Sequence, residues 1–488
     1  MLFEQDRMLI GGELVASESK EWDVSIDPAT EQEIGRSPAA TQADVYRAVE
    51  AAEAAAPAWA ALHARDRAKI LRSVGAALQQ HASELLKVEV TDTGNTITPM
   101  RGDVNATVNT IDHMTGLGYE LKGETIPASP GNLHYSVLEP FGVVGRIVAF
   151  NHPILFLLAR SMPALVAGNT LVIKPSESSP LSAMAIAEIA KDIFPPGVFN
   201  IVTGSGRAVG DAIVRHPRIK RLSFIGSVVT GMAIQRSAAE VMIKKVSLEL
   251  GGKNPMIVFP DVDLDEVANA AVAGMNFTWS GQSCGSLSRL MLHEDIYDAV
   301  LDRVVARVAA LRVGDPMSDD TQMGPVNSRV QYEKVQRYVG IGQDDGAQLA
   351  TGGSRPAGSD FSRGFWIRPT VFAGVEAGMR IAREEVFGPI MSVMKWSNID
   401  QAIKMANATD YGLTAAIWTN DITQALKTAS RVKSGYQWIN GYSTHFIGTG
   451  FGGMGNSGVG REECLEDIVS YTETKTVHII MKRYSNSI

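Results

Sequence analysis

The chain has 488 residues, enough for two or three domains, because single hydrophobic cores stop growing near roughly 250–300 residues. Its formal net charge is −8 and it has no long basic run, which argues against nucleic acid or an anionic membrane as the main partner. The only cysteines are Cys284 and Cys464, and no His/Cys cluster has zinc spacing. We therefore expect no disulfide framework, no metal site and a reducing, cytoplasmic location.

Two stretches bear on targeting and membranes. Residues 1–7 place acids where a signal peptide needs a basic and then an apolar region, so we expect no targeting segment. The most apolar stretch, residues 141–168, contains Arg146, Asn151 and Arg160, which would be costly in lipid. We expect this stretch to be core.

The first elements have clear turn and cap signals. Gly11 and Gly12 can take the positive φ angles of a tight turn. Thr41 is a helix cap with Asp44 three residues on, near the exposed amides of the first turn. The predicted elements are a hairpin over 8–15, a strand pair with its corner at Asp27-Pro28, a helix from Thr41 to Pro57 and a helix over about 65–91.

From residue 138 short apolar runs alternate with helical ones, a pattern typical of right-handed crossovers and a parallel sheet covered on both faces. A second α/β set follows Pro255 and contains Cys284. The predicted fold class is α/β, with a Rossmann-like doubly wound domain and a second α/β domain. The first set comprises runs at 143–150, 163–165, 170–173, 183–193, 199–202 and 221–224. The second comprises 256–259, 263–277, 290–292, 297–311, 370–372, 391–396 and 415–418.

Two further strands, 133–138 and 475–482, have no neighbour along the chain with which to pair. Isolated strands leave open edges, so we expect each to pair with another sheet, in a neighbouring subunit. The sequence therefore predicts a small β extension and an oligomer.

The segment 248–289 contains two reactive groups. Glu249 precedes Cys284 by 35 residues, and each lies among small residues. A thiolate is among the best nucleophiles that a protein can supply, and a carboxylate can serve as a base. On its own, a lone intracellular cysteine is more often an inert buried residue.

Four other stretches place these two residues in a wider pattern: 141–153, 174–177, 224–231 and 384–389. With Glu249 and Cys284, they resemble the NAD(P)-dependent aldehyde dehydrogenase superfamily in order and separation, over nearly the whole chain. The resemblance implies the following organisation. Residues 1–120 and 141–250 form an NAD-binding domain, 251–456 a catalytic domain, and 121–140 with 470–488 the oligomerisation strands of a homodimer or homotetramer.

The resemblance also implies a cofactor site. Gly226 and Ser227 should meet the pyrophosphate at a helix N-terminus, where free amides favour anions. Lys174 and Glu177 match residues that contact the adenine-side ribose. The charge of Glu177 would repel a 2′-phosphate, so NAD is expected, with NADP possible. The remaining residues implied on the cofactor surface are Gly206, Gly210, Phe224, Leu250, Glu385 at the nicotinamide ribose, and Phe387 beside it.

The implied reaction is covalent oxidation of an aldehyde. Cys284 adds to the carbonyl, and the amide of Asn151 with the backbone N–H of Cys284 stabilises the oxyanion. Hydride transfer then leaves a thioester, and Glu249 activates the water that hydrolyses it. Relatives that transfer the acyl group to coenzyme A usually lack this glutamate, which favours release of a free acid.

The chain departs from the family pattern around the pocket. Many members of the family have an aromatic residue directly after the oxyanion asparagine, but this chain has His152 there. Seven residues later, where many members have tryptophan, this chain has Ala159. The loss of an aromatic cage argues against betaine aldehyde and favours a bulky or aromatic substrate. Arg160 replaces a lysine and is expected to be a salt-bridge partner or a carboxylate-binding residue. His152 is expected to be a satisfied polar neighbour rather than a proton relay.

Further pocket residues implied by the resemblance are Phe156, Ser283, Gly285, Tyr442, Phe446 and Phe451. The spacing of 35 between Glu249 and Cys284 is one longer than is common in the family, so residues 276–280 are expected to carry an insertion and to shape the pocket mouth.

The sequence leaves open two alternative functions, a coenzyme A-acylating dehydrogenase and an inactive dinucleotide-binding structural protein. A Cys-His thiol hydrolase would need a histidine base that no motif supplies.

Overall fold

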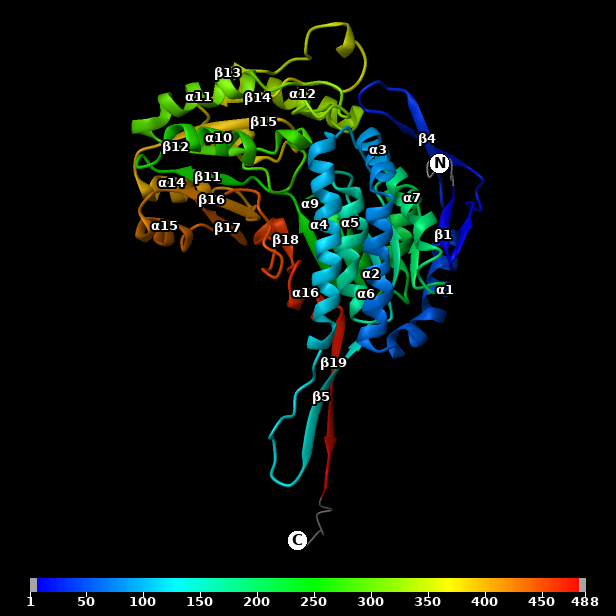
Figure 1. Cartoon of the computed structure of the whole chain (residues 1–488). Helices are drawn as coiled ribbons and strands as arrows, with labels where there is room; N and C mark the ends of the chain where they lie inside the picture. Colours follow the sequence, from blue (N-terminus) through cyan, green and yellow to red (C-terminus); the bar gives the residue numbers. More distant parts are fainter. Residues whose placement is uncertain (1–6, 482–488) are drawn as a thin grey trace.

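The structure, a computed structural model, describes residues 7–481. It has two α/β lobes side by side and a two-stranded arm that projects away from them (Figure 1). Residues 1–7, where we expect no targeting segment, lie almost wholly outside the described residues, and so does residue 482 at the end of the predicted C-terminal strand. Among the described residues, no helix is both long and apolar enough to cross a bilayer.

The first lobe is built on an eight-stranded sheet of order β18-β10-β9-β6-β7-β8-β1-β2. Strands β10, β9, β6, β7 and β8 are parallel, and the strands at both edges are antiparallel. The bounds are β1 Met8–Ile10, β2 Glu13–Val15, β6 Val143–Ile147, β7 Thr170–Lys174, β8 Phe199–Ile201, β9 Arg221–Gly226, β10 Lys245–Leu250 and β18 Gly458–Val459.

Helices cover this sheet on both faces, and buried apolar side chains fill the space on each side. The bounds are α1 Gln42–Ala61, α2 Ala64–Gln80, α3 Ala82–Thr93, α4 Ile97–Gly116, α5 Pro153–Leu158, α6 Met162–Val166, α7 Leu181–Ala190, α8 Asp211–Arg215 and α9 Val228–Ala239. A separate hairpin of β3 (Trp22–Ile26) and β4 (Glu33–Pro38) lies outside the sheet. The doubly wound architecture predicted from the alternating pattern is confirmed.

The order in which strands are added to this sheet reverses between β6 and β9, although the strands themselves stay parallel. From β6 it passes through β7 to β8 on one side, and then crosses to β9 on the other side of β6. Ligands of open α/β sheets bind at the carboxyl ends of the strands beside such a reversal. The residues that follow β6, β9 and β10 therefore share the edge where a ligand is expected.

Two helix predictions near the N-terminus need correction. The helix capped by Thr41 has the expected capping box with Asp44, but it continues through Pro57 to Ala61. Pro57 lies on the exposed face, where water can replace the lost hydrogen bond, and Trp59 anchors the last turn through its Nε1 donor to Leu165 O at 3.1 Å. The predicted helix over 65–91 is two helices, α2 and α3, separated at His81.

The second lobe has a seven-stranded sheet of order β13-β14-β15-β12-β11-β16-β17, parallel except for β13. Its strands are β11 Pro255–Val258, β12 Arg289–His293, β13 Gln348–Thr351, β14 Thr370–Ala373, β15 Ile390–Trp396, β16 Thr414–Trp418 and β17 Tyr436–Ile439. Its helices are α10 Leu264–Gly274, α11 Tyr297–Ala309, α12 Arg329–Asp344, α13 Arg380–Arg383, α14 Ile399–Ala406 and α15 Ile422–Ala429; α16 Leu465–Val469 follows β18.

The two sheets meet end to end. Strand β10 ends at Leu250 and β11 begins at Pro255, so the carboxyl end of one parallel sheet leads directly to the amino end of the other. Residues that precede β12 and β15 therefore face residues that follow β6, β9 and β10. Glu249 and Cys284 both lie at this junction.

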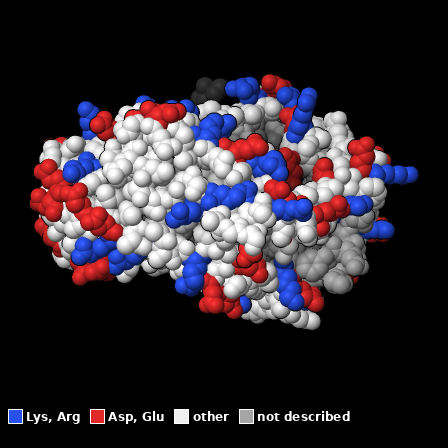
Figure 2. Space-filling view, turned by 90° about the horizontal axis from the view of Figure 1, so that it is seen from above, with Lys and Arg blue, Asp and Glu red and all other residues white. Residues whose placement is uncertain are grey.

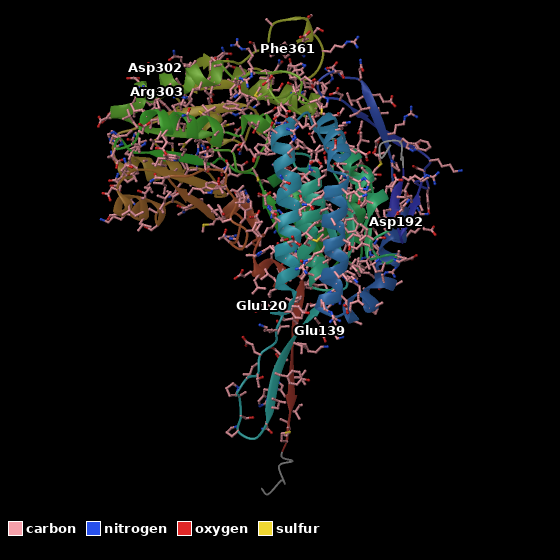
Figure 3. All side chains as sticks on the ribbon, in the orientation of Figure 1. Glu120, Glu139, Asp192, Asp302, Arg303 and Phe361 are labelled. Atoms are coloured by element: carbon pink, nitrogen blue, oxygen red, sulfur yellow. The ribbon has the colours of Figure 1, made fainter. Side chains whose placement is uncertain are left out.

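The arm consists of β5 (Leu133–Pro140) and β19 (Thr472–Ile479), paired antiparallel along eight residues each. The expectation that both strands lack a partner within the chain is wrong, because they pair with each other. Glu139, labelled near the base of the arm in Figure 3, forms an ion pair with Lys475. Ile480 and Met481 at its tip are exposed, so pairing with a neighbouring subunit stays a prediction.

On the face of the molecule seen in Figure 2, acidic and basic side chains are interspersed.

Candidate active site

A cavity of about 360 Å³ lies at the junction of the two lobes. Glu249 at the end of β10 and Cys284, five residues before β12, both line it. Helices α4 and α5 of the first lobe form one wall, and loops of the second lobe form the other. The structure thus brings the candidate base and the candidate nucleophile into one space.

The backbone around Cys284 is fixed by Asn254. The Nδ2 atom of Asn254 donates to Cys284 O at 2.7 Å and to Ser286 O at 2.9 Å, while its Oδ1 accepts from Thr414 N at 3.1 Å. Gly252 lies against the same loop, because a Cβ there would be 2.9 Å from Cys284 O. The thiol is therefore presented from a well-anchored loop.

The Glu249 side chain is 7% exposed, and its Oε1 has no hydrogen-bond partner among the described residues. Burial, reinforced by the nearby charge of Glu462, raises the pKa of this carboxyl group to about 8. Burial also raises the pKa of the Cys284 thiol, and the neighbouring carboxylate of Glu249 raises it further. A carboxyl group with a pKa near neutrality can both accept and return a proton.

Asn151 follows β6 and is 2% exposed. Its backbone carbonyl accepts a hydrogen bond from Nδ2 of Asn95 at 2.9 Å, and the carbonyl of Phe150 accepts one from Ser179 Oγ at 3.1 Å. The segment is therefore held at the sheet edge. Asn151 is not among the residues that line the cavity, whereas His152 is.

Gly226 and Ser227 join β9 to α9. Ser227 caps the helix by accepting from Thr230 N at 3.2 Å, and the helix N-terminus is exposed. A Cβ at Gly226 would lie 2.5 Å from the ring of Phe224, and one at Gly231 would lie 2.9 Å from Leu250. Both glycines thus make room for the Phe224 and Leu250 side chains beneath α9. The exposed N-terminus of the helix offers the free backbone amides that favour anions.

Lys174 is the last residue of β7, and Glu177 follows it at the same sheet edge. Burial lowers the pKa of Lys174 to about 8, although Glu177 opposes the shift, and its Nζ donates to Pro175 O at 2.9 Å. The exposed Glu177 accepts from the backbone N of Gly206 through Oε2 at 2.8 Å. Gly210 packs near Lys174, since a Cβ there would be 3.8 Å from the lysine Cδ. These residues form one surface.

Glu385 and Phe387 lie before β15. Oε1 of Glu385 accepts from Gly252 N at 2.9 Å, and a Cβ at Gly251 would be only 2.0 Å from its Oε2. Phe387 has a φ of 56° and meets the ring of Phe150 edge to face at 5.7 Å. Both residues thus lie between the loop that carries Cys284 and the carboxyl edge of the first sheet.

Six of the eight predicted pocket residues line the cavity: Phe156, Ala159, Arg160, Ser283, Gly285 and Phe451. The other two do not. Tyr442 packs against the core of the second lobe, and Phe446 is 57% exposed. Asn276 and Trp279, from the run expected at the pocket mouth, also line the cavity.

Arg160 is an ion-pair residue. Its Nε lies 3.2 Å from Oε2 of Glu462, and its other end bonds Glu463, which also contacts Nδ1 of His445 at 2.8 Å. Burial alone would lower the pKa of Arg160, but the two glutamates raise it above its ordinary value. Of the two roles expected for this arginine, the structure shows the salt bridge.

Sequence reasoning missed several lining residues, because they carry no catalytic motif. Helix α4 has no site signal, and only its packing against α5 brings its polar face to the cavity. A weak signal existed in the Glu462-Glu463 doublet, since adjacent buried acids need a cation. The missed residues are Asp103, Ala106, Asn109, Thr110, Leu155, Trp438, Ser443, His445, Ile447, Glu462 and Glu463.

Residues 14–477 match the sequence profile of the Aldehyde dehydrogenase family. The chain belongs to the aldehyde dehydrogenase family. The aldehyde dehydrogenase tropH of Talaromyces stipitatus is 43% identical over 462 residues, which cover 93% of this chain and 89% of that protein. The resemblance predicted from the motifs is confirmed.

Solved aldehyde dehydrogenase structures share the fold throughout. A putative aldehyde dehydrogenase from Burkholderia cenocepacia is 39% identical with a TM-score of 0.95, covering 98% of this chain and 97% of its own. The NAD⁺ complex of an aldehyde dehydrogenase from Bacillus cereus is 37% identical with a TM-score of 0.95 and the same coverage. The predicted fold class is therefore confirmed.

Proposed function

We propose that this protein oxidises an uncharged aldehyde to a carboxylic acid with NAD, through a thioester on Cys284 that a water activated by Glu249 hydrolyses. The observation that carries this proposal is the shared cavity of Cys284 and a buried Glu249 whose pKa is about 8. The NAD⁺ complex of the Bacillus cereus relative supports the choice of cofactor.

The residues at the sheet edge fit NAD. The exposed N-terminus of α9, with Gly226 beneath it, suits a pyrophosphate, and Glu385 lies close to Gly251 and Gly252 on the Cys284 side. Bound NAD supplies a hydride acceptor. The negative charge of the exposed Glu177 favours a free ribose 2′-hydroxyl over a 2′-phosphate.

The protein's own groups carry the other steps. The Cys284 thiol passes its proton to Glu249 and attacks the carbonyl carbon, and the Cys284 backbone N–H with the Asn151 amide is proposed to stabilise the oxyanion. Glu249 releases that proton to solvent before the second half of the reaction. It then takes a proton from water, and the hydroxide that results adds to the thioester and displaces the Cys284 thiolate as the free acid forms.

The cavity favours an uncharged substrate. Its lining includes the acidic residues Asp103, Glu462 and Glu463, and its one arginine is already paired with two of them. A substrate carboxylate would therefore meet repulsion without a free cation to offset it. The small side chain of Ala159 lines the cavity beside Phe156, which supports a bulky aldehyde as substrate.

The test is NADH formation from NAD with benzaldehyde, hexanal and succinate semialdehyde, together with acid release in the absence of coenzyme A. We expect turnover of the first two, weak turnover of the third, and loss of turnover in Cys284→Ser. A requirement for coenzyme A would favour the acylating alternative. NAD binding without turnover of any aldehyde would favour the structural-protein alternative.

A further inference from the structure

The wall of the cavity formed by α4 and α5 holds a histidine-aspartate pair. Nδ1 of His152 lies 2.7 Å from Oδ2 of Asp103, and both residues line the cavity. The side chains are 14% and 11% exposed, so the pair is largely shielded from bulk solvent. A buried contact of this kind, unlike an exposed one, fixes the orientation of the ring.

Asp103 determines which ring nitrogen carries the proton. A carboxylate oxygen only accepts, so the Nδ1–H of His152 is the donor. In the neutral ring, Nε2 then carries a lone pair. No described residue forms a hydrogen bond with Nε2, although the other nitrogen is satisfied. The cavity wall therefore presents an unused acceptor.

Aromatic rings hold His152 in this position. Its ring centroid lies 5.2 Å from that of Phe156 and 5.4 Å from that of Trp279. These two rings limit the swing of the imidazole, and both also line the cavity. Nε2 is thus an acceptor held beside aromatic side chains of the cavity wall.

The size and polarity of this space restrict the ligand. A cavity of roughly 150 Å³ accommodates a benzene ring, and this cavity measures about 360 Å³. The ring walls of Phe156, Trp279 and Phe451 suit a flat substrate. The polar lining is rich in acceptors, so a polar substituent on the ring is favoured when it donates a hydrogen bond.

We propose that the substrate is an aromatic aldehyde with a ring hydroxyl, and that this hydroxyl donates a hydrogen bond to Nε2 of His152, which Asp103 positions. This inference rests on the proposed function, because it names the substrate class of the same site. It adds His152 as a specificity-determining residue and Asp103 as its positioning residue.

The test compares kcat/KM for benzaldehyde, the three hydroxybenzaldehydes and their methoxy analogues, at a pH where the phenols are neutral. A methoxy group is electronically similar to a hydroxyl but cannot donate. We expect at least one hydroxy isomer to exceed its methoxy analogue by on the order of three- to tenfold, the usual range for one such bond.

Variants then locate the acceptor. His152→Phe keeps a ring of similar size without the nitrogen, so the hydroxy-to-methoxy ratio should fall to about 1. Benzaldehyde turnover should change much less, which a purely structural loss would not produce.

Asp103→Leu should lower the same ratio, and Asp103→Asn should restore part of it, since its amide oxygen can accept from Nδ1–H. Thr110→Val, on the same helix and lining the same cavity, is the matched control and should keep the ratio.

The outcomes separate the two proposals. Turnover of benzaldehyde and hexanal with no hydroxy isomer above its methoxy analogue overturns the inference and leaves the dehydrogenase proposal standing. A ratio that His152→Phe leaves unchanged also overturns it. Absence of NADH formation from every aldehyde overturns the dehydrogenase proposal and the inference together.

Discussion

The thiol of Cys284 and the carboxyl group of Glu249 lie on the wall of one cavity, although they come from opposite lobes. Burial and then Glu249 are the largest causes of the raised thiol pKa. The carboxyl group that is proposed to take the thiol proton thus also suppresses premature ionisation of the thiol.

Glu249→Gln should shift the ionisation of Cys284 to lower pH. The substitution removes a neighbouring negative charge while it preserves size, so the thiolate becomes easier to form. The rate of iodoacetamide alkylation, with the modified cysteine identified by mass spectrometry, should rise at lower pH than in the wild type. Cys464 is buried and serves as the internal reference. An unchanged or upward shift would contradict the assigned electrostatics.

Thioester hydrolysis should accelerate as pH rises through about 8, the pKa of Glu249. Only about a tenth of this group is ionised one pH unit lower, so the single-turnover rate of acid release should rise about tenfold between pH 7 and 9. The measurement is quenched-flow release of acid after thioester formation. Glu249→Gln should be slow and nearly pH-independent; a profile identical to that of the wild type would assign the base elsewhere.

Arg160→Met should destabilise the fold. Burial would raise the pKa of Glu463, but Arg160 and His445 outweigh it and hold the value at about 2. Because this is below the unfolded value of about 4.3, the pair stabilises the protein above that pH, and the contribution is lost as pH falls toward 2. We expect a loss of ~3–5 kcal/mol at pH 7, and less at pH 4, from urea unfolding.

The matched control for this substitution is Arg101→Met. Arg101 pairs with Asp319 on the surface, where both side chains are largely exposed. Its loss should cost ~0–1 kcal/mol. Equal destabilisation by the two variants would show that the buried cluster has no special role.

Ile480→Glu should weaken self-association. Ile480 is 57% exposed and Met481 is 68% exposed at the end of the arm, where the sequence predicts pairing with another subunit. Light scattering after size-exclusion chromatography should show a smaller particle than the wild type, or a lower affinity between subunits. Lys191→Glu, a charge change on the body of the first lobe, is the control. A wild-type monomer would refute the predicted oligomer.

Local chemistry explains which parts of the fold could be predicted from the sequence. The cap at Thr41, the glycine turn at Gly11-Gly12 and the strands after residue 143 depend on neighbours in the chain, and the structure contains all of them. The pairing of β5 with β19 could not be predicted, because it joins residues such as His134 and His478 that are 344 positions apart. The alternation of apolar and polar residues in a strand predicts which face of the strand is buried, but not which distant strand it pairs with.

The site shows the same division. Glu249 and Cys284 have motifs and could be selected directly. Asp103 could not, because it is one acid among many on a helix and gains meaning only where α4 packs beside His152. The break at His81 was missed for a similar reason, since the apolar spacing continues across it.

The free edge of β10, the strand that carries Glu249, is covered late in synthesis by β18. Glu249 pairs with Gly458 of β18, where a Cβ would lie 2.0 Å from Leu248 O, and β18 closes the edge of the first sheet. A ribosome-bound chain that ends before residue 458 therefore exposes the open edge of β10. Until that edge is covered, nascent chains present a pairing surface to chaperones and to one another. Strand β10, which carries Glu249, therefore gains its last hydrogen-bonded neighbour only when synthesis of the polypeptide is nearly complete.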